Sequence, residues 1–243
     1  QDASNSNSEL FIDPYVLVGA LSGVLADEDV VIPCSSGGAL TVTMQALELR
    51  ETQTAVTNKG LASMGYGLAG AIGAAFSLPQ NRVVLIEGDG GFIQNMQELG
   101  TLAANKLNVK IILFSNEGYA SIRMTQQSYF EGEYIGCDVS TGLGLPDWRL
   151  LCASFGIPQT MLDPARCLKE QLRVAIESDG PCVVVVPIDP QQTYYPKISS
   201  SIAEDGTMMS NPLHQMTPPL EVELSRKVFR FLGSQQEASV EQD

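Results

Sequence analysis

The run RVVLIEGDGGFIQNMQELGTLAANKLNVKIILFSNEG, residues 82–118, decides the fold of this chain. It contains two apolar, β-branched segments, Arg82–Glu87 and Val109–Phe114, which are typical of buried strands. Between them, residues 92–105 have the apolar spacing of a helix. Strands joined through helices form parallel pairs with right-handed crossovers, in a sheet that is covered on both faces. The run therefore predicts an α/β domain.

Segments of the same kind lie on both sides of this run. Val30–Ile32 and Cys182–Ile188 are further buried-strand candidates, and Asp13 is a candidate N-cap that precedes Pro14 at the first position of a helix. Helices are predicted over residues 13–26, 39–49, 64–77, 119–127, 147–155 and 164–178. We expect a doubly wound, mainly parallel sheet with helices on both faces.

The expected organisation is one α/β domain with two flanking segments. Residues 1–11 are a polar N-terminal segment, residues 12–190 form the domain, and residues 191–243 form an extended C-terminal tail with one short helix at 220–232. Because the chain begins at Gln1 and not at a methionine, we interpret it as a piece of a longer polypeptide.

Composition excludes several classes of partner. The 243 residues carry 14 Lys and Arg against 28 Asp and Glu, a formal charge of −14, which disfavours nucleic acid. No apolar run reaches the roughly 20 residues of a membrane helix. The five cysteines form no CxxC pair, so we expect reduced, mostly buried thiols and a cytoplasmic protein.

Three polar or glycine-rich segments follow the predicted strands, at residues 35–38, 88–91 and 115–118. Ligands bind beyond the carboxyl ends of parallel strands, where glycines and helix N-termini present N–H groups to phosphates. Asp89 and Asn116 add the oxygen ligands that Mg²⁺ prefers. Each segment taken singly is an ordinary turn; their placement at three strand ends favours a Mg²⁺-diphosphate site.

The sequence Gly88-Asp89-Gly90, followed 27 residues later by Asn116, resembles the cofactor signature of thiamin diphosphate-dependent enzymes. KGLASMGYGLAGAIGA (residues 59–74) and GDGGFIQNMQEL (residues 88–99) are similar to the acetolactate synthase branch. The resemblance covers roughly residues 12–190. It implies the thiamin diphosphate-binding fold and, within it, the C-terminal diphosphate-binding (PP) domain.

The resemblance also implies roles for individual residues. The metal ligands would be Asp89, Asn116 and the Gly118 carbonyl group. Met64 would hold thiamin diphosphate in its bent, reactive shape, although a methionine that fills a gap in the core is the alternative. The full set of implied cofactor-binding residues is Ser36, Gly37, Gly38, Ala39, Met64, Gly88, Asp89, Gly90, Gly91, Asn116, Gly118, Tyr119, Ala120 and Ser121.

The activity implied is that of a decarboxylase (a lyase) or carboligase (a transferase) that removes CO₂ from a 2-oxo acid. The family's pyrimidine-binding domain, with its activating glutamate, is absent from this sequence. We therefore expect another region or subunit to complete the site, in a dimer or tetramer. The alternatives are a non-catalytic assembly or regulatory subunit that keeps the fold, and an unrelated nucleotide-binding domain, which the lack of G-x-G-x-x-G after the first strand disfavours.

The segment after Asn116 resembles relatives that act on sugar or polyol carbonyls more than dedicated acetolactate synthases. Within it, Tyr119, Arg123 and Gln126 are candidates to meet an acceptor substrate; Arg123 alternatively pairs with a surface acid. His214, the only histidine, lies in the tail and is not expected to be catalytic, and Glu98 is expected to bond within its own helix.

Overall fold

The computed structural model describes residues 10–202 and 206–231. The chain divides into two units, residues 1–192 and 193–243. The strands of the first unit are β1 (Val30–Pro33), β2 (Thr54–Ala55), β3 (Val83–Gly88), β4 (Val109–Ser115), β5 (Gln159–Met161) and β6 (Cys182–Pro187). Its α-helices are α1 (Pro14–Ser22), α2 (Gly37–Ala46), α3 (Tyr66–Ser77), α4 (Asp89–Phe92), α5 (Leu99–Ala104), α6 (Ala120–Tyr129), α7 (Trp148–Ser154) and α8 (Leu168–Ile176).

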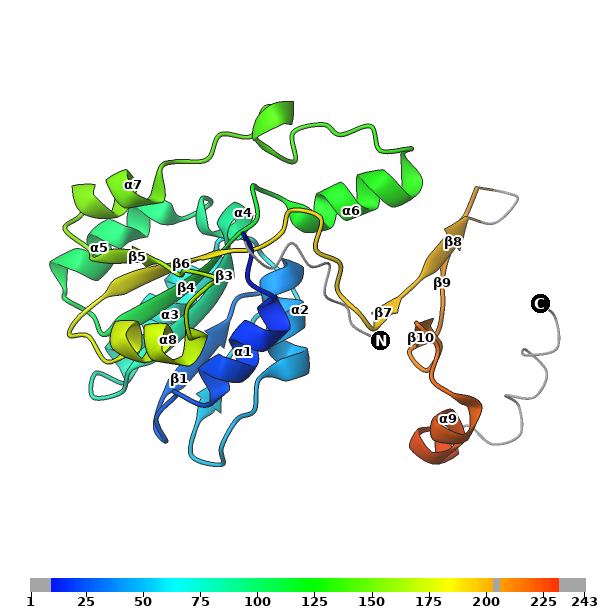
Figure 1. Cartoon of the computed structure of the whole chain (residues 1–243), viewed down its shortest axis with the longest axis horizontal. Helices are drawn as coiled ribbons and strands as arrows, with labels where there is room; N and C mark the ends of the chain where they lie inside the picture. Colours follow the sequence, from blue (N-terminus) through cyan, green and yellow to red (C-terminus); the bar gives the residue numbers. More distant parts are fainter. Residues whose placement is uncertain (1–9, 203–205, 232–243) are drawn as a thin grey trace. The chain divides into compact units, whose positions relative to one another are not determined.

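The strands form one sheet in the order β2-β1-β3-β4-β6-β5, and every pair is parallel (Figure 1). The predicted fold class, a doubly wound parallel sheet, is confirmed. From β1 the chain first forms β2 on one side and then returns to place β3 on the other side. The carboxyl ends of β1 and β3 therefore meet at a topological switch point, where open α/β sheets bind their ligands.

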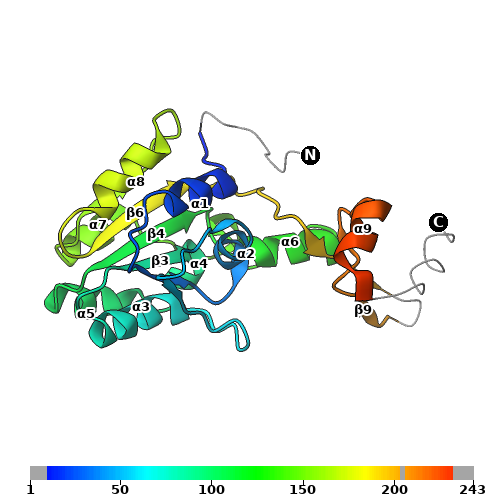
Figure 2. The ribbon, with the colours of Figure 1, turned by 90° about the horizontal axis from the view of Figure 1, so that it is seen from below.

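Helices cover both faces of the sheet (Figure 2). On one face α1 packs against α2 and α8. On the other face the main core brings side chains of β1, β3, β4 and β6 against α3, α5 and α7, with Phe92 and Trp148 in edge-to-face contact at 6.0 Å. Apolar layers on both faces of the sheet explain why its central strands are nearly continuous hydrophobic runs.

The predicted start of the first helix is confirmed. The Asp13 carboxylate accepts hydrogen bonds from the backbone N–H groups of Tyr15 (2.7 Å) and Val16 (3.1 Å), and Pro14 occupies the first helical position. The helix ends at Ser22, earlier than its apolar pattern suggested, because the Gly23 N–H closes the last turn on the carbonyl groups of Ala20 and Leu21.

The single helix predicted over residues 92–105 is wrong. The segment is divided into α4, a 3₁₀ turn η1 (Met96–Glu98) and α5. Asn95 leaves the helical conformation with φ −138°, and its side-chain amide donates to the Gly65 carbonyl at 2.9 Å. This contact joins the segment after β3 to the residue that precedes α3. The edge strands β2 and β5 were also missed, because they are only two and three residues long and largely exposed.

The second unit contains two short antiparallel pairs and one helix. β7 (Lys197–Ile198) pairs with β10 (Met216–Thr217), and β8 (Ser200–Ile202) pairs with β9 (Met208–Ser210). The helix α9 (Val222–Val228) lies within the segment 220–232 for which a helix was predicted. The described part of the tail thus contains short antiparallel strand pairs, where an extended tail with one short helix was expected. Residues 1–9 of the predicted N-terminal segment lie outside the described residues.

A search of residues 10–202 and 206–231 finds no helix whose length and apolar character would let it cross a bilayer.

Candidate functional site

A cavity of about 290 Å³ lies at the carboxyl edge of the sheet, lined by the segments that follow β1, β3 and β4. It brings together nearly all of the site residues predicted from the sequence: Ser36, Gly37, Gly38, Ala39, Met64, Gly88, Asp89, Gly91, Asn116, Gly118, Tyr119, Ala120 and Ser121. Gly90 is buried beside this lining and is not part of it. Met64 comes from a fourth segment, between β2 and α3, so four segments that are distant in sequence form one site.

Three polar groups meet in the lining of this cavity: the Asp89 carboxylate, the Asn116 side-chain amide and the Gly118 backbone carbonyl. One terminal atom of the Asn116 amide lies 3.0 Å from Gly118 O and 3.1 Å from Asp89 Oδ1. With nitrogen at that position, the amide donates to both oxygens. Rotation of the amide by about 180° would put its oxygen there, and the three oxygens would then be arranged as ligands of a cation.

The spacing of these atoms fits Mg²⁺. An octahedral Mg²⁺ binds oxygen at about 2.0–2.1 Å, which separates neighbouring ligands by about 3.0 Å. The distances of 3.0 and 3.1 Å match that separation. The described residues contain no cluster of three or more His, Cys, Asp and Glu side chains, so the donor set here is the mixed, all-oxygen kind that hard cations prefer.

The backbone holds the Asp89 carboxylate in place. Its Oδ1 accepts from the Gly90 N–H at 2.7 Å, and its Oδ2 accepts from the N–H groups of Asn116 (2.9 Å) and Gly118 (3.1 Å). Asp89 is fully buried, and burial raises the pKa of its carboxyl group to about 6, against the lowering effect of these donors. A bound cation would favour the charged form.

The two glycines after Asp89 are required by neighbouring side chains. A Cβ atom on Gly90 would lie 2.4 Å from Cδ1 of Tyr119, and one on Gly91 would lie 2.5 Å from Oε1 of Glu87. The sequence suggested that these glycines let a diphosphate approach the backbone. In the structure, the absence of a side chain at these glycines leaves room for the Tyr119 ring and the buried Glu87 carboxylate.

The loop after β1 supplies the opposite wall. Gly37, which begins α2, has φ +75°, a conformation that favours glycine, and the ten-residue helix starts at the cavity. The Ser36 side chain, at the N-cap of α2, makes no capping hydrogen bond. The first N–H groups of α2 are therefore available to bind an anion. No described residue lining the cavity is Lys, Arg or His.

Met64 lines the cavity and remains 43% exposed. A methionine that fills a gap in the core would be buried, so the alternative considered from the sequence does not fit. Tyr119 also lines the cavity, but its ring lies against Gly90 and its hydroxyl accepts from the Gln94 side-chain amide at 2.8 Å. This places Tyr119 against the loop after β3.

Two of the candidates to meet an acceptor, Arg123 and Gln126, bond to the backbone and do not line the cavity. Arg123 is only 5% exposed and donates to backbone carbonyl groups, so both its predicted roles, substrate contact and surface ion pair, are wrong. Gln126 exchanges hydrogen bonds with the backbone of Ile135, at 3.2 Å in each direction, and holds the loop after α6. Both residues position chain segments.

Sequence reasoning missed Glu87. It is 4% exposed at the end of β3, and its carboxyl group bonds to the Cys34 thiol and the N–H groups of Gly67 and Gly88. Burial raises its pKa to about 7. A Cβ atom on Gly67 would lie 2.0 Å from Glu87 Oε2, so the glycine at the start of α3 makes room for the acid. The available signal was an acid inside an otherwise apolar strand.

The stability of the metal-free protein should fall as pH rises from about 4.5 to about 7. The folded state keeps the Glu87 proton up to about pH 7, whereas the unfolded state releases it near 4.5, so ionisation favours unfolding. The upper limit of this loss is about 3 kcal/mol. Asp89 adds a loss of the same sign up to about pH 6.

Chemical unfolding in EDTA at pH 5, 6, 7 and 8 measures this effect. The variant Glu87→Gln cannot ionise and should give a flatter profile, particularly between pH 6 and 7. Equal pH profiles for wild type and variant would contradict the assignment.

The remaining predictions concern cysteine, glutamate and histidine. All five cysteines are free and four are buried, as expected, with Cys167 exposed. Glu98 accepts from the Thr101 hydroxyl at 2.7 Å within its own helical segment, as predicted. His214 lies in the second unit, where its ring contacts Phe229 at 5.9 Å.

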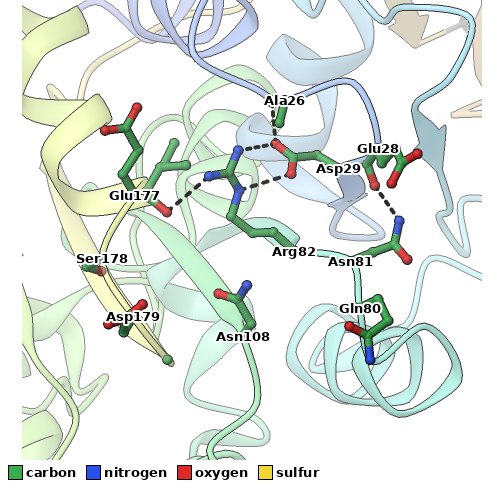
Figure 3. A pocket seen from close by; sticks show the side chains of 12 residues that line it. Ala26, Glu28, Asp29, Gln80, Asn81, Arg82, Asn108, Glu177, Ser178 and Asp179 are labelled. Atoms are coloured by element: carbon green, nitrogen blue, oxygen red, sulfur yellow. Dashed lines mark hydrogen bonds and ion pairs between the residues drawn. The ribbon is translucent and has the colours of Figure 1, made fainter.

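A second cavity, of about 350 Å³, lies at the opposite edge of the sheet (Figure 3). Arg82 crosses it and binds Asp29 through two hydrogen bonds, at 3.0 and 2.5 Å, while its third nitrogen donates to the Ile176 carbonyl at 3.2 Å. The guanidinium of Arg82 and the carboxylate of Asp29 thus form an ion pair within this cavity. This cavity therefore has the character of a structural crevice.

Comparison with known proteins matches this chain to one family and to longer relatives. The family described as "Thiamine pyrophosphate enzyme, C-terminal TPP binding domain" matches residues 36–186. Acetolactate synthase isozyme 1 large subunit of Escherichia coli K12 is 32% identical over 193 residues, which are 79% of this chain and 34% of that protein. The mitochondrial acetolactate synthase catalytic subunit of Aspergillus candidus is 32% identical over 209 residues, 85% of this chain and 29% of its own.

Among solved structures, a thiamine diphosphate-dependent 4-hydroxybenzoylformate decarboxylase of Rhodococcus jostii RHA1 superposes with a TM-score of 0.67. It is 22% identical, over 79% of this chain and 35% of its own, so the likeness concerns the fold. This chain spans about a third of the length of each of these three proteins.

Proposed function

Since this chain belongs to the thiamine pyrophosphate enzymes, as their C-terminal cofactor-binding domain, we propose that it supplies the Mg²⁺-diphosphate half of a 2-oxo acid decarboxylase or carboligase. The observation that carries the proposal is that the Asp89 carboxylate, the Asn116 side-chain amide and the Gly118 carbonyl meet in one cavity, with contacts of 3.0 and 3.1 Å that match the spacing of Mg²⁺ ligands. Family membership rules out the unrelated nucleotide-binding domain considered from the sequence.

The residues of this chain would bind and orient the cofactor. Asp89, Asn116 and the Gly118 carbonyl would hold Mg²⁺, and the N–H groups at the start of α2 would face the diphosphate. No cationic side chain of the described residues lines the cavity. The metal ion and the backbone N–H groups would therefore neutralise the negative charge of the diphosphate. Met64, exposed in the same cavity, would contact the middle of the cofactor.

Bound thiamin diphosphate supplies the carbanion chemistry by which CO₂ is removed from a 2-oxo acid. This chain excludes water from the metal side of the site, since Asp89 and Asn116 are 0% and 6% exposed. It also keeps the two metal-binding loops in register through the bonds from Asn116 N–H and Gly118 N–H to Asp89. No residue lining the cavity offers an imidazole base, so proton transfer would rest on the cofactor and the completing domain.

We infer that a pyrimidine-binding domain, from the same longer protein or from another subunit, completes the site. The chain spans only about a third of its relatives' length. Two apolar side chains that line the cavity, Met64 and Ile122, are 43% and 41% exposed, as expected where another body covers the site. A dimer or tetramer follows from sharing the cofactor between subunits. The five free cysteines support a reducing compartment, the cytoplasm.

The acceptor proposed for the carboligase reaction is a sugar or polyol carbonyl, because the segment after Asn116 resembles relatives with such substrates. With Arg123 and Gln126 bound to the backbone, the residues of this segment that line the cavity, and so are placed to face an acceptor, are Tyr119, Ala120, Ser121 and Ile122.

Calorimetric titration of thiamin diphosphate into the full-length protein, with Mg²⁺ and with EDTA, tests the binding function. We expect saturable binding that requires Mg²⁺. CO₂ release from a panel of 2-oxo acids, with and without sugar aldehydes or ketones, then tests the reaction. Binding without CO₂ release from any 2-oxo acid would favour a non-catalytic assembly or regulatory subunit, and absence of Mg²⁺-dependent binding would reject the proposal.

A further inference from the structure

Arg123 is a buried cation that bonds only to backbone oxygen. It lies in the first turn of α6 and is 5% exposed. Its Nη2 donates to the carbonyl groups of Asn116 (2.5 Å) and Pro190 (3.2 Å), and its Nη1 donates to the Glu117 carbonyl (3.2 Å). Within the described part of the chain, its Nε has no hydrogen-bond partner and its guanidinium forms no ion pair. Its charge also has a lowering effect, through space, on the pKa of the Asp89 and Asp138 carboxyl groups, without a direct ion pair to either. A cation desolvated in this way is costly unless the site uses it.

In the loop from Asn116 to Gly118, backbone N–H groups bond to Asp89 and backbone carbonyl groups bond to Arg123. The N–H groups of Asn116 and Gly118 point to the Asp89 carboxylate. The carbonyl groups of Asn116 and Glu117 point to the guanidinium. The Gly118 carbonyl is left beside the Asn116 side-chain amide, which also contacts the Asp89 carboxylate.

This arrangement requires an unusual backbone. Glu117 has φ +66° and Gly118 has φ +128°, so two successive residues lie in the region that L side chains rarely adopt. Such a conformation persists only where its surroundings determine it. Asp89 fixes the donors of the loop and Arg123 fixes its acceptors, and the bond to Pro190 joins the loop to the segment that follows β6.

We propose that Arg123 is a positioning residue that turns the Gly118 carbonyl and the Asn116 amide toward the metal ion. The proposal rests on the proposed function, since it presumes that Mg²⁺ binds between these oxygens. Arg123 itself contacts neither metal nor cofactor. Its role is to hold two carbonyl groups away from the site, so that a third one faces it.

The planar fork of arginine matters here as well as its charge. Two nitrogens on one rigid plane reach three carbonyl groups from two segments of the chain. A lysine at this position would keep a positive charge but would present a single point donor on a flexible stem. The lysine variant therefore separates positioning of the loop from the electrostatic effect of the charge.

The test measures Mg²⁺ affinity in the full-length protein saturated with thiamin diphosphate, by calorimetry or by Mn²⁺ electron paramagnetic resonance. The variants are Arg123→Met and Arg123→Lys. Partners that orient metal ligands typically contribute 10–100-fold to affinity, so we expect Arg123→Met to lose about that much and Arg123→Lys to lose about tenfold.

Arg50→Met is the matched control. Arg50 also donates to a backbone carbonyl, that of Leu25 at 2.7 Å, and bonds to Asp27, but it does not line the cavity. Its replacement should leave Mg²⁺ affinity unchanged. Circular dichroism and thermal unfolding without ligands establish that each variant is folded. If Arg123→Met does not fold, the Mg²⁺ affinity of Arg123→Lys tests the inference.

Wild-type affinity in Arg123→Met would overturn the inference while leaving the proposed function intact. Wild-type Mg²⁺ affinity in Arg123→Lys would also overturn the inference, because a positive charge alone would then be enough to maintain the metal site. A wild-type protein that binds no Mg²⁺-cofactor pair would instead reject the proposed function, and the inference with it.

Discussion

Replacement of Asp89 by asparagine is expected to weaken Mg²⁺-dependent binding of thiamin diphosphate by more than about a hundredfold, the largest effect on function that the structure predicts. The carboxylate supplies one metal ligand and also accepts three backbone N–H groups, from Gly90, Asn116 and Gly118. An amide has one oxygen and so cannot serve all of these partners. Both the metal charge and the geometry of the adjoining loop would be lost.

Calorimetric titration of the full-length variant measures this change. Asp147→Asn is the control, because Asp147 is an exposed N-cap of α7 that accepts from the Leu150 N–H and does not line the cavity. It should bind the cofactor as the wild type does, with only a small loss of stability. Unchanged affinity in Asp89→Asn would remove Asp89 from the metal site.

The largest effect on stability is expected at the opposite edge of the sheet, where breaking the Asp29–Arg82 pair should cost about 3–5 kcal/mol. Asp29 is 3% exposed and accepts from Arg82 and from the Ala26 N–H at 2.7 Å. Figure 3 shows the guanidinium of Arg82 bonded to this carboxylate, and the guanidinium also donates to the Ile176 carbonyl at 3.2 Å. Removing either charge leaves the other buried and uncompensated.

A double-mutant cycle with Asp29→Leu and Arg82→Met tests this account. Each single variant should unfold at a clearly lower denaturant concentration, and the double variant should lose far less than the sum of the two. Folded fractions of all three should retain wild-type cofactor affinity, because this edge of the sheet lies away from the cavity. Additive losses would show that the two charges do not depend on one another.

Much of this architecture could be predicted from sequence because its signals are local. The apolar runs at Val83–Gly88 and Val109–Ser115 are long, β-branched and bounded by glycine or polar residues, so strand type and parallel pairing followed from composition. The Asp13-Pro14 start of α1 was equally local. The short exposed strands β2 and β5 carry too few residues to produce such a signal.

Only some of the residues at the site could be assigned from the sequence. Asp89 and Asn116 could be placed together because each follows a parallel strand, and carboxyl ends of neighbouring strands meet. Arg123 and Gln126 were misjudged, because their partners are backbone carbonyl and N–H groups, which every residue has and no sequence pattern marks.

The sequence by itself determined the order of strands and helices, the class of fold and the polar residues at the strand ends, since these depend on periodicity along the chain. Only the tertiary structure decided which glycines make room for which side chains, that Glu87 is buried beneath the site, and that Arg123 faces carbonyl groups. The physical reason is that burial and hydrogen-bond geometry arise between segments far apart in the chain. Arg123 and Pro190 are 67 residues apart, yet they bond at 3.2 Å.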